Sequence, residues 1–222
     1  MAKSSGFVTQ LLVLIVSIAF PFGITEAQTT PSVNASLDSS KNQIDTHGYM
    51  PIFDETTLNG WSMAGEGTFS ITDENALQSA GQGIFWYTKK KFENFVLELD
   101  WKVSNSNDNS GVFVRFSDPG KDPKTAVKSG YEIQIDDGAG NPLHKTGAIY
   151  DFSAPAKMVS NPPGQWNSMK IEVVNQSYTV SINEEKVNDF IGDRLETGYI
   201  GLQSHDDESK VAFRNITVKE IF

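Results

Sequence analysis

The segment Tyr131–Asp136 carries the side chains of this chain best suited to chemistry. It reads Y-E-I-Q-I-D, with strict alternation of polar and apolar residues. Because successive side chains of a β-strand point to opposite faces, Glu132, Gln134 and Asp136 share one face of the expected strand. A row of carboxylate and amide groups can bind a hydroxyl-rich ligand; the alternative is an ordinary solvated sheet face.

Two further segments repeat this alternation. Residues 109–115 read N-S-G-V-F-V-R, and residues 199–205 read Y-I-G-L-Q-S-H. The first pattern predicts that Arg115 lies on a polar face, and the second predicts the same for Gln203 and His205. Three strands are therefore expected to offer polar side chains to one ligand.

Glu132 and Asp136 resemble the paired carboxylates of a glycosidase, but their spacing is unsuitable. Four residues of a regular strand span roughly 13 Å. Retaining glycosidases need carboxyl groups about 5–5.5 Å apart, and inverting enzymes need about 6.5–9.5 Å. The spacing therefore disfavours an ordinary two-carboxylate mechanism.

Other candidates for binding a sugar are aromatic or amide side chains outside the alternating row. We expect Tyr150, beside Asp151, and Trp166, in a P-P-G-Q-W-N turn, to line the cleft. Asn109 and Gln134 are suited to sugar hydroxyls. Trp101 lies on an apolar strand face and is expected in the core.

A divalent metal ion is a cofactor that the donor set allows. Glu132, Asp136 and His205 offer oxygen and imidazole ligands. No motif of fixed ligand spacing supports a metal site, and no other cofactor is expected. His144 is expected at the surface, with a rim position or a second imidazole ligand as the alternatives.

Short alternating segments indicate the elements that position these residues. No long segment has a helical period, so the pattern is typical of an all-β sandwich or barrel. Turn residues predict hairpin connections near 175–177 and 183–186. The clearest expected strands are 95–103, 111–116, 131–136, 170–174, 178–182, 199–203 and 211–221.

Two long loops are expected between these strands, at residues 117–130 and 137–146. Both are rich in Gly, Asp and Pro, which favour turns. Loops of this length in a compact β domain are often rims of a functional site, and the alternative is a tolerated surface insertion.

The N-terminus indicates export. Lys3 precedes an apolar run at Leu11–Phe20, so residues 1–27 are predicted to be a signal peptide that is removed. An uncleaved membrane anchor is the alternative, although the run is short for a bilayer span. Residues 28–48 are predicted to be a flexible linker, and residues 49–222 a single domain.

Charge and composition narrow the classes of partner. The 222-residue chain has a formal net charge of −10 and no cysteine. An acidic protein is a poor partner for nucleic acid, and no phosphate-binding glycine motif provides a nucleotide site. The absence of cysteine excludes disulfides and thiolate metal sites within this chain. A neutral sugar is compatible with this charge.

An ordered set of motifs resembles the 3-keto-disaccharide hydrolase domain family, also described as 3-keto-glucoside 1,2-lyases and 3-keto-2-hydroxy-glucal hydratases. The resemblance covers about residues 50–222 and implies a concanavalin A-like jelly roll of two antiparallel sheets. The motifs are P-I-F-D-E-T-T-L-N-G-W (51–61), N-S-G-V-F-V-R (109–115), Y-E-I-Q-I-D-D (131–137), T-G-A-I-Y-D (146–151), G-Q-W-N (164–167), I-G-L-Q-S-H (200–205) and F-R-N-I (213–216).

This resemblance implies cleavage of 3-keto-glycosides by β-elimination followed by hydration. That chemistry needs a base, a group that stabilises an enolate oxygen, and a proton donor. His205 is expected to be the base, with satisfaction of nearby backbone groups as the alternative. Arg115 is expected at the enolate oxygen, or in an ion pair with Glu132. Glu132 is expected to act as acid, base or metal ligand.

Two other functions stay open at this point. The same fold, aromatic residues and amides would suffice for a non-catalytic carbohydrate-binding module, and an envelope interaction domain would need no sugar at all. The enzymatic hypothesis also implies a partner reaction, because a glycoside 3-oxidoreductase has to produce the 3-keto substrate.

Overall fold

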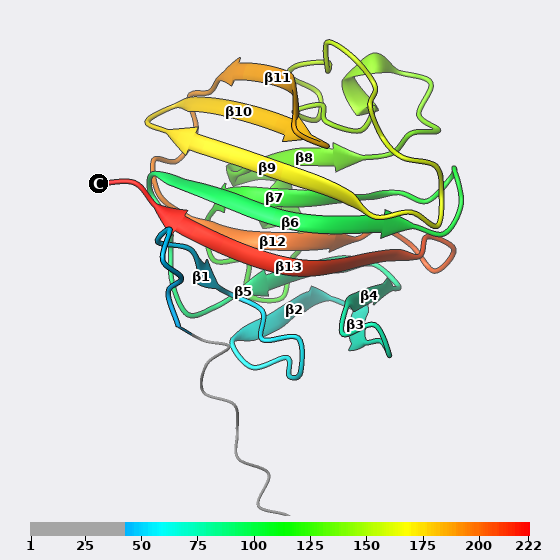
Figure 1. The fold of residues 1–222 in the computed structure, drawn as a ribbon, viewed down its shortest axis with the longest axis horizontal. Helices are drawn as coiled ribbons and strands as arrows, with labels where there is room; N and C mark the ends of the chain where they lie inside the picture. The colour runs from blue at the N-terminus through cyan, green and yellow to red at the C-terminus, as the bar shows by residue number, and fades with distance from the viewer. Residues whose placement is uncertain (1–42) are drawn as a thin grey trace, which may run out of the picture. The chain divides into compact units, whose positions relative to one another are not determined.

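Two antiparallel β-sheets stack face to face in this protein (Figure 1). The computed structural model describes residues 43–222, so the predicted signal peptide and most of the predicted linker lie outside the described residues. Within residues 43–222, no helix has the length and apolar character that a membrane crossing requires. The prediction of an all-β sandwich of two antiparallel sheets is confirmed.

The first sheet has eight strands and faces the viewer in Figure 1. Its strands alternate buried and partly exposed residues, as a half-buried antiparallel sheet requires. Asn183 and Glu184, both with positive φ, form the two-residue turn between β10 and β11. In spatial order the strands are β11 (Glu185–Ile191), β10 (Ser177–Ile182), β9 (Asn167–Val174), β6 (Phe95–Val103), β13 (Val211–Glu220), β4 (Leu77–Ala80) and β3 (Thr68–Ile71), and β1 (Met50–Pro51) also pairs with β13.

The second sheet has five strands and carries the polar row expected from the sequence. In spatial order they are β2 (Trp61–Gly65), β5 (Gly83–Tyr87), β12 (Tyr199–Ser204), β7 (Ser110–Phe116) and β8 (Tyr131–Ile135). Each of these strands pairs with its neighbours in antiparallel orientation. Glu132 and Gln134 therefore lie on an edge strand, two strands away from Gln203.

Apolar side chains fill the space between the two sheets. Trp101 is fully buried there, as expected, together with Ile133 and Leu202. A second, smaller apolar cluster lies on the outer face of the five-stranded sheet. It consists of Ala64, Ile84, Trp86, Phe113, Phe116 and Ala126.

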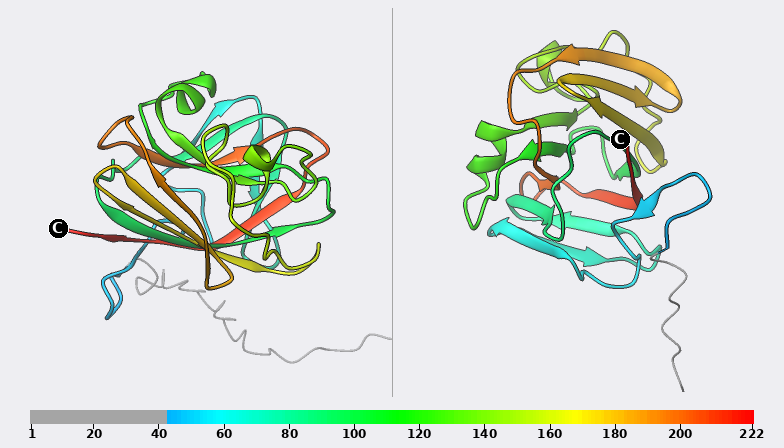
Figure 2. Two further views of the ribbon diagram at one scale, coloured as in Figure 1. Left: turned by 90° about the horizontal axis from the view of Figure 1, so that it is seen from above. Right: turned by 90° about the vertical axis from the view of Figure 1, so that its left-hand side faces the viewer.

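The short helix α1 (Lys124–Ser129) covers this second cluster. Ala126 packs against the outer face of the five-stranded sheet, and Figure 2 shows the helix on the side away from the eight-stranded sheet. The sequence predicted a loop over residues 117–130, and the structure instead has a helix within this segment. A helix of six residues is too short to show an amphipathic period, and its packing on the sheet stabilises it.

Candidate functional site

Glu132 lies over Gly111 on the outer face of the five-stranded sheet. Gly111 pairs with Gln134, and Phe113 pairs with Glu132. A methyl group built on Gly111 would approach the Oε1 atom of Glu132 to 2.3 Å. The absence of a side chain at this position therefore makes the space into which the carboxyl group of Glu132 extends.

Burial changes the acidity of Glu132. Only 7% of the residue is exposed, and desolvation, followed by the charge of Asp151, raises the pKa of its carboxyl group to about 8. A neutral carboxylic acid at pH 7 can donate a proton, which an ordinary surface glutamate cannot do. Strongly shifted groups of this kind are frequent in active sites.

An amide and carboxylate network continues from Glu132 along the edge strand. In one orientation of its amide, Gln134 donates to the Ser110 carbonyl at 3.0 Å and to Glu132 Oε1 at 3.2 Å, and in the other it donates to Asn109 Oδ1. The amides of Gln134 and Asn109 lie 3.3 Å apart, and Asn109 Nδ2 donates to Asp136 Oδ2 at 3.3 Å. The structure thus brings these predicted polar residues together.

His205 lies at the far end of the same face, directly after β12. Its Nδ1 atom contacts Asp206 Oδ2 at 2.6 Å. Burial would raise the pKa of Asp206, but hydrogen bonds from His205, Ser209 and Glu208 outweigh it and lower this pKa to about 2. An ionised Asp206 holds the Nδ1 proton, which leaves Nε2 as the basic nitrogen.

Asp136 links the two ends of the site. Desolvation raises the pKa of its carboxyl group, while backbone hydrogen bonds from Ala139 and Gly138 and the charges of Lys145 and His205 oppose the rise. His205 therefore lies within electrostatic range of Asp136. Gln203 is the second residue before His205 and lies beside Gly111, since Leu202 pairs with Val112 on the neighbouring strand. The Gln203 carbonyl also accepts a hydrogen bond from Ser110 Oγ at 2.7 Å.

The loop after β8 closes over Glu132. Tyr150 donates its backbone N–H to the Glu132 carbonyl at 2.9 Å, and its ring stacks on that of His144 at 4.3 Å. His144 Nε2 contacts Asp151 Oδ1 at 2.7 Å. Tyr150 therefore lies beside Glu132, and His144 lies next to Tyr150 and Asp151 at the edge of this region.

Two adjoining hollows flank α1 and give access to these residues. The larger, of about 240 Å³, is lined by residues that include Gln82, Lys124, Gln203 and His205. The smaller, of about 130 Å³, is lined by Phe113, Val127, Gly130, Glu132, Tyr150, Asp151, Phe152 and Arg194. Val127 lines both hollows, so they adjoin at this residue.

The prediction that Arg115 shares this face is wrong. Tyr199 pairs with Phe116 and Ile200 pairs with Val114, so Arg115 is the extra residue of a β-bulge, with φ of 52°. The bulge turns its side chain inward, where it is fully buried.

Buried carbonyl groups, rather than Glu132, are the partners of the Arg115 guanidinium. Its Nε donates to the Glu93 carbonyl at 2.9 Å, and another nitrogen donates to the Asn175 carbonyl. The guanidinium also lies over the Tyr178 ring, at 5.6 Å. Arg115 therefore connects the two sheets. It neither stabilises an enolate nor forms the alternative ion pair with Glu132.

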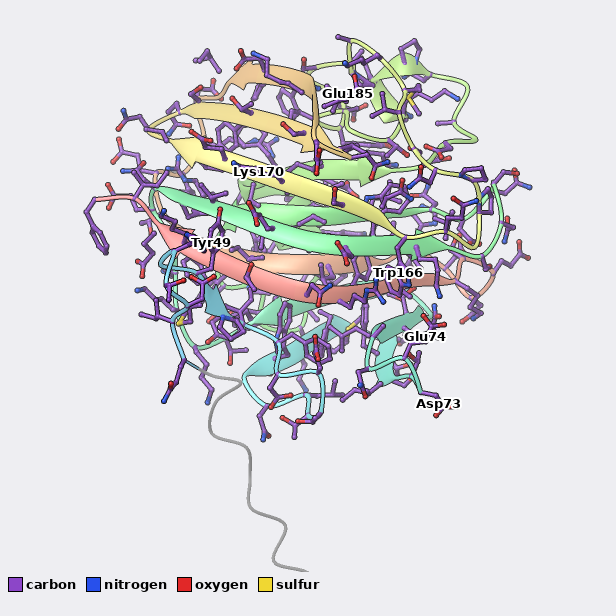
Figure 3. All side chains as sticks on the ribbon, in the orientation of Figure 1. Tyr49, Asp73, Glu74, Trp166, Lys170 and Glu185 are labelled. Carbon is purple, nitrogen blue, oxygen red and sulfur yellow. The ribbon has the colours of Figure 1, made fainter. Side chains whose placement is uncertain are left out.

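Trp166 is also outside the candidate site, contrary to the prediction. It lies at the outer face of the eight-stranded sheet, near the strands β6 and β13 (Figure 3). The Arg214 guanidinium lies 4.0 Å from its ring centroid and Lys102 Nζ lies 4.6 Å away. These cations cover the ring that a sugar would need.

A wider hollow, of about 620 Å³, lies on the same outer face as Trp166. Glu98, Asp100 and Lys170 contribute to its lining. Asp100 already accepts hydrogen bonds from Arg214 and Asn215, and Glu98 accepts one from Tyr49. These partnered charges are typical of the solvated face of a half-buried sheet, so we place the candidate site on the five-stranded sheet despite its smaller hollows.

Glu132, Asp136 and His205, the candidate metal ligands, do not form a compact set. In the part of the chain that the structure describes, no group of three or more His, Cys, Asp or Glu side chains could hold a metal ion. The arrangement instead favours proton transfer, with an acidic group at one end of the face and an oriented imidazole at the other.

Sequence reasoning missed three contributors to this site. Gly111 was part of a quoted motif, and a glycine inside a strand is a signal of close approach. Asp206 directly follows His205, and this adjacency is a signal for a carboxylate that orients the imidazole. Arg194 carried no signal, because it lies in a loop far from the other site residues in the sequence.

Comparison with known proteins identifies relatives of this chain. The sequence profile of the 3-keto-alpha-glucoside-1,2-lyase-like domain matches residues 48–219. A 3-keto-disaccharide hydrolase from Bacteroides thetaiotaomicron is 27% identical, with alignment of 83% of this chain and 82% of that protein.

Solved structures support the fold. A candidate glycosyl hydrolase from Parabacteroides distasonis superimposes with a TM-score of 0.70 at 24% identity, over 82% of this chain and 99% of that one. The carbohydrate-binding module CBM66 from Bacillus subtilis gives a TM-score of 0.54 at 19% identity, over 72% of this chain and 96% of the module. These likenesses agree with the concanavalin A-like sandwich predicted above.

Proposed function

This chain belongs to the 3-keto-alpha-glucoside-1,2-lyase-like domain family, and we propose that it is a carbohydrate-active enzyme that cleaves 3-keto-glycosides. The observation that carries the proposal is a protonatable, buried Glu132 on the same sheet face as the oriented imidazole of His205. The name of the relative from Bacteroides thetaiotaomicron supports the substrate class.

The first step needs removal of the hydrogen at C2 of the 3-keto sugar. Nε2 of His205 takes this proton, while Asp206 holds the opposite nitrogen. The electron pair of the C2–H bond forms an enolate with the C3 ketone. Gln203 and Lys124, which line the same hollow as His205, are the donors available to the enolate oxygen in place of Arg115.

The second step needs a proton for the departing oxygen. As the enolate re-forms the C3 carbonyl, the C1–O bond breaks, and a C1–C2 double bond forms. Glu132 gives its proton to the leaving oxygen, because its carboxyl group is neutral at pH 7. Addition of water to C1 and return of a proton to C2 then complete a net hydrolysis.

NMR in D₂O tests both the substrate class and the mechanism. The purified protein is mixed with a 3-keto-disaccharide and, separately, with its unoxidised parent. We expect cleavage of the keto sugar alone, with deuterium at C2 of the 3-keto-glucose formed. A sample without protein measures spontaneous exchange at C2. Cleavage without deuterium would exclude the elimination step.

Other outcomes of the same experiment separate the remaining functions. Saturable changes in the sugar signals without cleavage would instead favour a carbohydrate-binding module. If neither sugar binds, both the enzymatic function and the carbohydrate-binding function are contradicted. Repetition with a chelator tests the candidate metal set Glu132, Asp136 and His205, because a metal-dependent reaction would stop.

The cellular setting is part of this proposal. The apolar run at Leu11–Phe20 is the reason to propose export. A 3-keto substrate requires an oxidation at C3 before this reaction, so a glycoside 3-oxidoreductase acts upstream. Detection of the protein outside the cytoplasm with residues 1–27 removed would test the first statement.

A further inference from the structure

The smaller hollow combines the carboxyl groups of Glu132 and Asp151 with an apolar wall. Glu132 and Tyr150 lie on one side, and Phe113, Val127 and Phe152 supply apolar surface. Phe152 is 45% exposed and Val127 is 47% exposed. Large apolar side chains exposed next to a candidate proton donor indicate a surface that another apolar group covers.

Arg194 holds this wall in place. One of its terminal nitrogens donates to the Val127 carbonyl at 2.9 Å and to the Gly130 carbonyl. Its guanidinium lies 4.8 Å from the Phe152 ring centroid and 4.9 Å from that of Tyr131. Both sides of the hollow are therefore fixed before a ligand arrives, which lowers the entropy lost on binding.

The position of Glu132 determines which part of a substrate enters this hollow. Glu132 protonates the glycosidic oxygen in the proposed reaction, and His205 lies in the adjoining larger hollow with the sugar-binding amides. The sugar ring therefore occupies the larger hollow. The group on the other side of the glycosidic oxygen lies against Val127 and Phe152.

The size of the hollow agrees with a single flat ring. Its volume is about 130 Å³, and an apolar cavity of about 150 Å³ is known to take up benzene. A second hexose would place some hydroxyl groups against Phe113, Val127 and Phe152, which offer no hydrogen-bond partner, and unpaired polar groups oppose binding.

We propose that this hollow is an aglycone subsite for an apolar, aromatic leaving group, so that aryl 3-keto-glucosides are preferred over 3-keto-disaccharides. This inference rests on the proposed function. It deepens that function by assigning Val127 and Phe152 as the residues that determine specificity for the leaving group.

The test compares the specificity constants of single substrates between variants. Phenyl 3-keto-glucoside and a 3-keto-disaccharide are assayed with the wild type, Val127→Ser, Phe152→Ser and Phe152→Leu. For each substrate, the specificity constant of a variant is divided by that of the wild type, so differences in intrinsic reactivity between the two substrates cancel. We expect the preference for the phenyl substrate to fall about tenfold in either serine variant, mostly through KM, and to return in Phe152→Leu.

Met158→Ser is the matched control. Met158 is also 45% exposed, but it lines neither hollow. The inference is overturned if neither serine variant loses the preference, or if Met158→Ser loses it equally. If the subsite is overturned in this way, cleavage of the 3-keto-disaccharide by the wild type would still support the proposed function.

A binding measurement separates this inference from the reaction. If the wild type cleaves no 3-keto sugar, the proposed function fails, and saturation-transfer NMR with phenyl glucoside decides the subsite. Saturation of the phenyl protons in the wild type, with loss in Phe152→Ser but not in Met158→Ser, supports an apolar subsite. Equal saturation in all three proteins overturns it.

Discussion

Oε1 of Glu132 lies where a side chain on Gly111 would be, only 2.3 Å from the position of the missing Cβ. The two residues are on neighbouring strands, so the backbone pairing of β7 with β8 determines their relationship. Gly111 therefore has a clear positioning role in the candidate site, because it lets the buried carboxyl group lie close to the sheet surface.

Gly111→Ala should displace Glu132 and lower kcat by about 100-fold, since small misplacements of a catalytic group have effects of this size. Steady-state kinetics with a 3-keto-disaccharide measure the effect. Gly140→Ala is the control, because a Cβ at Gly140 meets no atom within 4 Å. Equal activity of both variants would remove the positioning role of Gly111.

Glu132 should make stability depend on pH. An unfolded glutamate titrates near 4.5 and the folded one near 8, so the folded state alone holds this proton between those values. Stability therefore falls as pH rises through this window, by about 1.4 kcal/mol per pH unit and by up to about 5 kcal/mol in total.

Glu132→Gln should abolish that loss, because the amide does not titrate. Denaturant unfolding of both proteins at pH 5 and pH 8.5 measures the free energies. The variant is expected to gain stability relative to the wild type only at the higher pH. Glu184→Gln, at an exposed position, is the control. A constant difference at both pH values would mean that burial does not shift this group.

His205→Ala should lower kcat by about 10²–10⁴-fold, the usual contribution of a general base. Asp206→Asn should have a smaller effect, since it keeps the imidazole but changes which nitrogen carries the proton. Loss of deuterium incorporation at C2 of the sugar would report the step directly. His47→Ala, at an exposed histidine, is the control. Full turnover in His205→Ala would exclude His205 as the base.

Arg115→Met should affect stability instead of chemistry. The variant leaves the Glu93 and Asn175 carbonyls without their charged donor, which costs about 3 kcal/mol. For a domain of this size the Tm should fall by roughly 6–12 °C. Thermal unfolding measures the shift, and assays well below the Tm should give wild-type kcat. A large fall in kcat in folded protein would return Arg115 to the reaction.

Tyr150 and Trp166 should differ in their effect on substrate affinity. Tyr150→Ala removes a ring that lines the hollow beside Glu132 and should raise KM about tenfold. Trp166→Ala should leave KM unchanged, because this ring is on the other sheet and is covered by Arg214 and Lys102. The opposite ranking would move the site to the eight-stranded sheet.

Alternation along the chain predicted the faces of most strands correctly. Glu132 and Gln134 lie on the outer face of their sheet, and Trp101 lies in the core, as expected. The strands between residues 50 and 87 were not foreseen in detail, since they are short and rich in glycine. The prediction for Arg115 was wrong because a β-bulge adds one residue to its strand, and the order of polar and apolar residues does not indicate where such a bulge occurs.

Outside the β-bulge at Arg115, the sequence by itself determined which side chains share a face, because the period of two is a property of each strand's own backbone. It also determined the family and the two-sheet architecture. Only the tertiary structure decided the acidity of Glu132, the pairing of His144 with Asp151, and the division of the site into two hollows. These depend on which distant loops exclude water from the sheet face, and no local pattern records that.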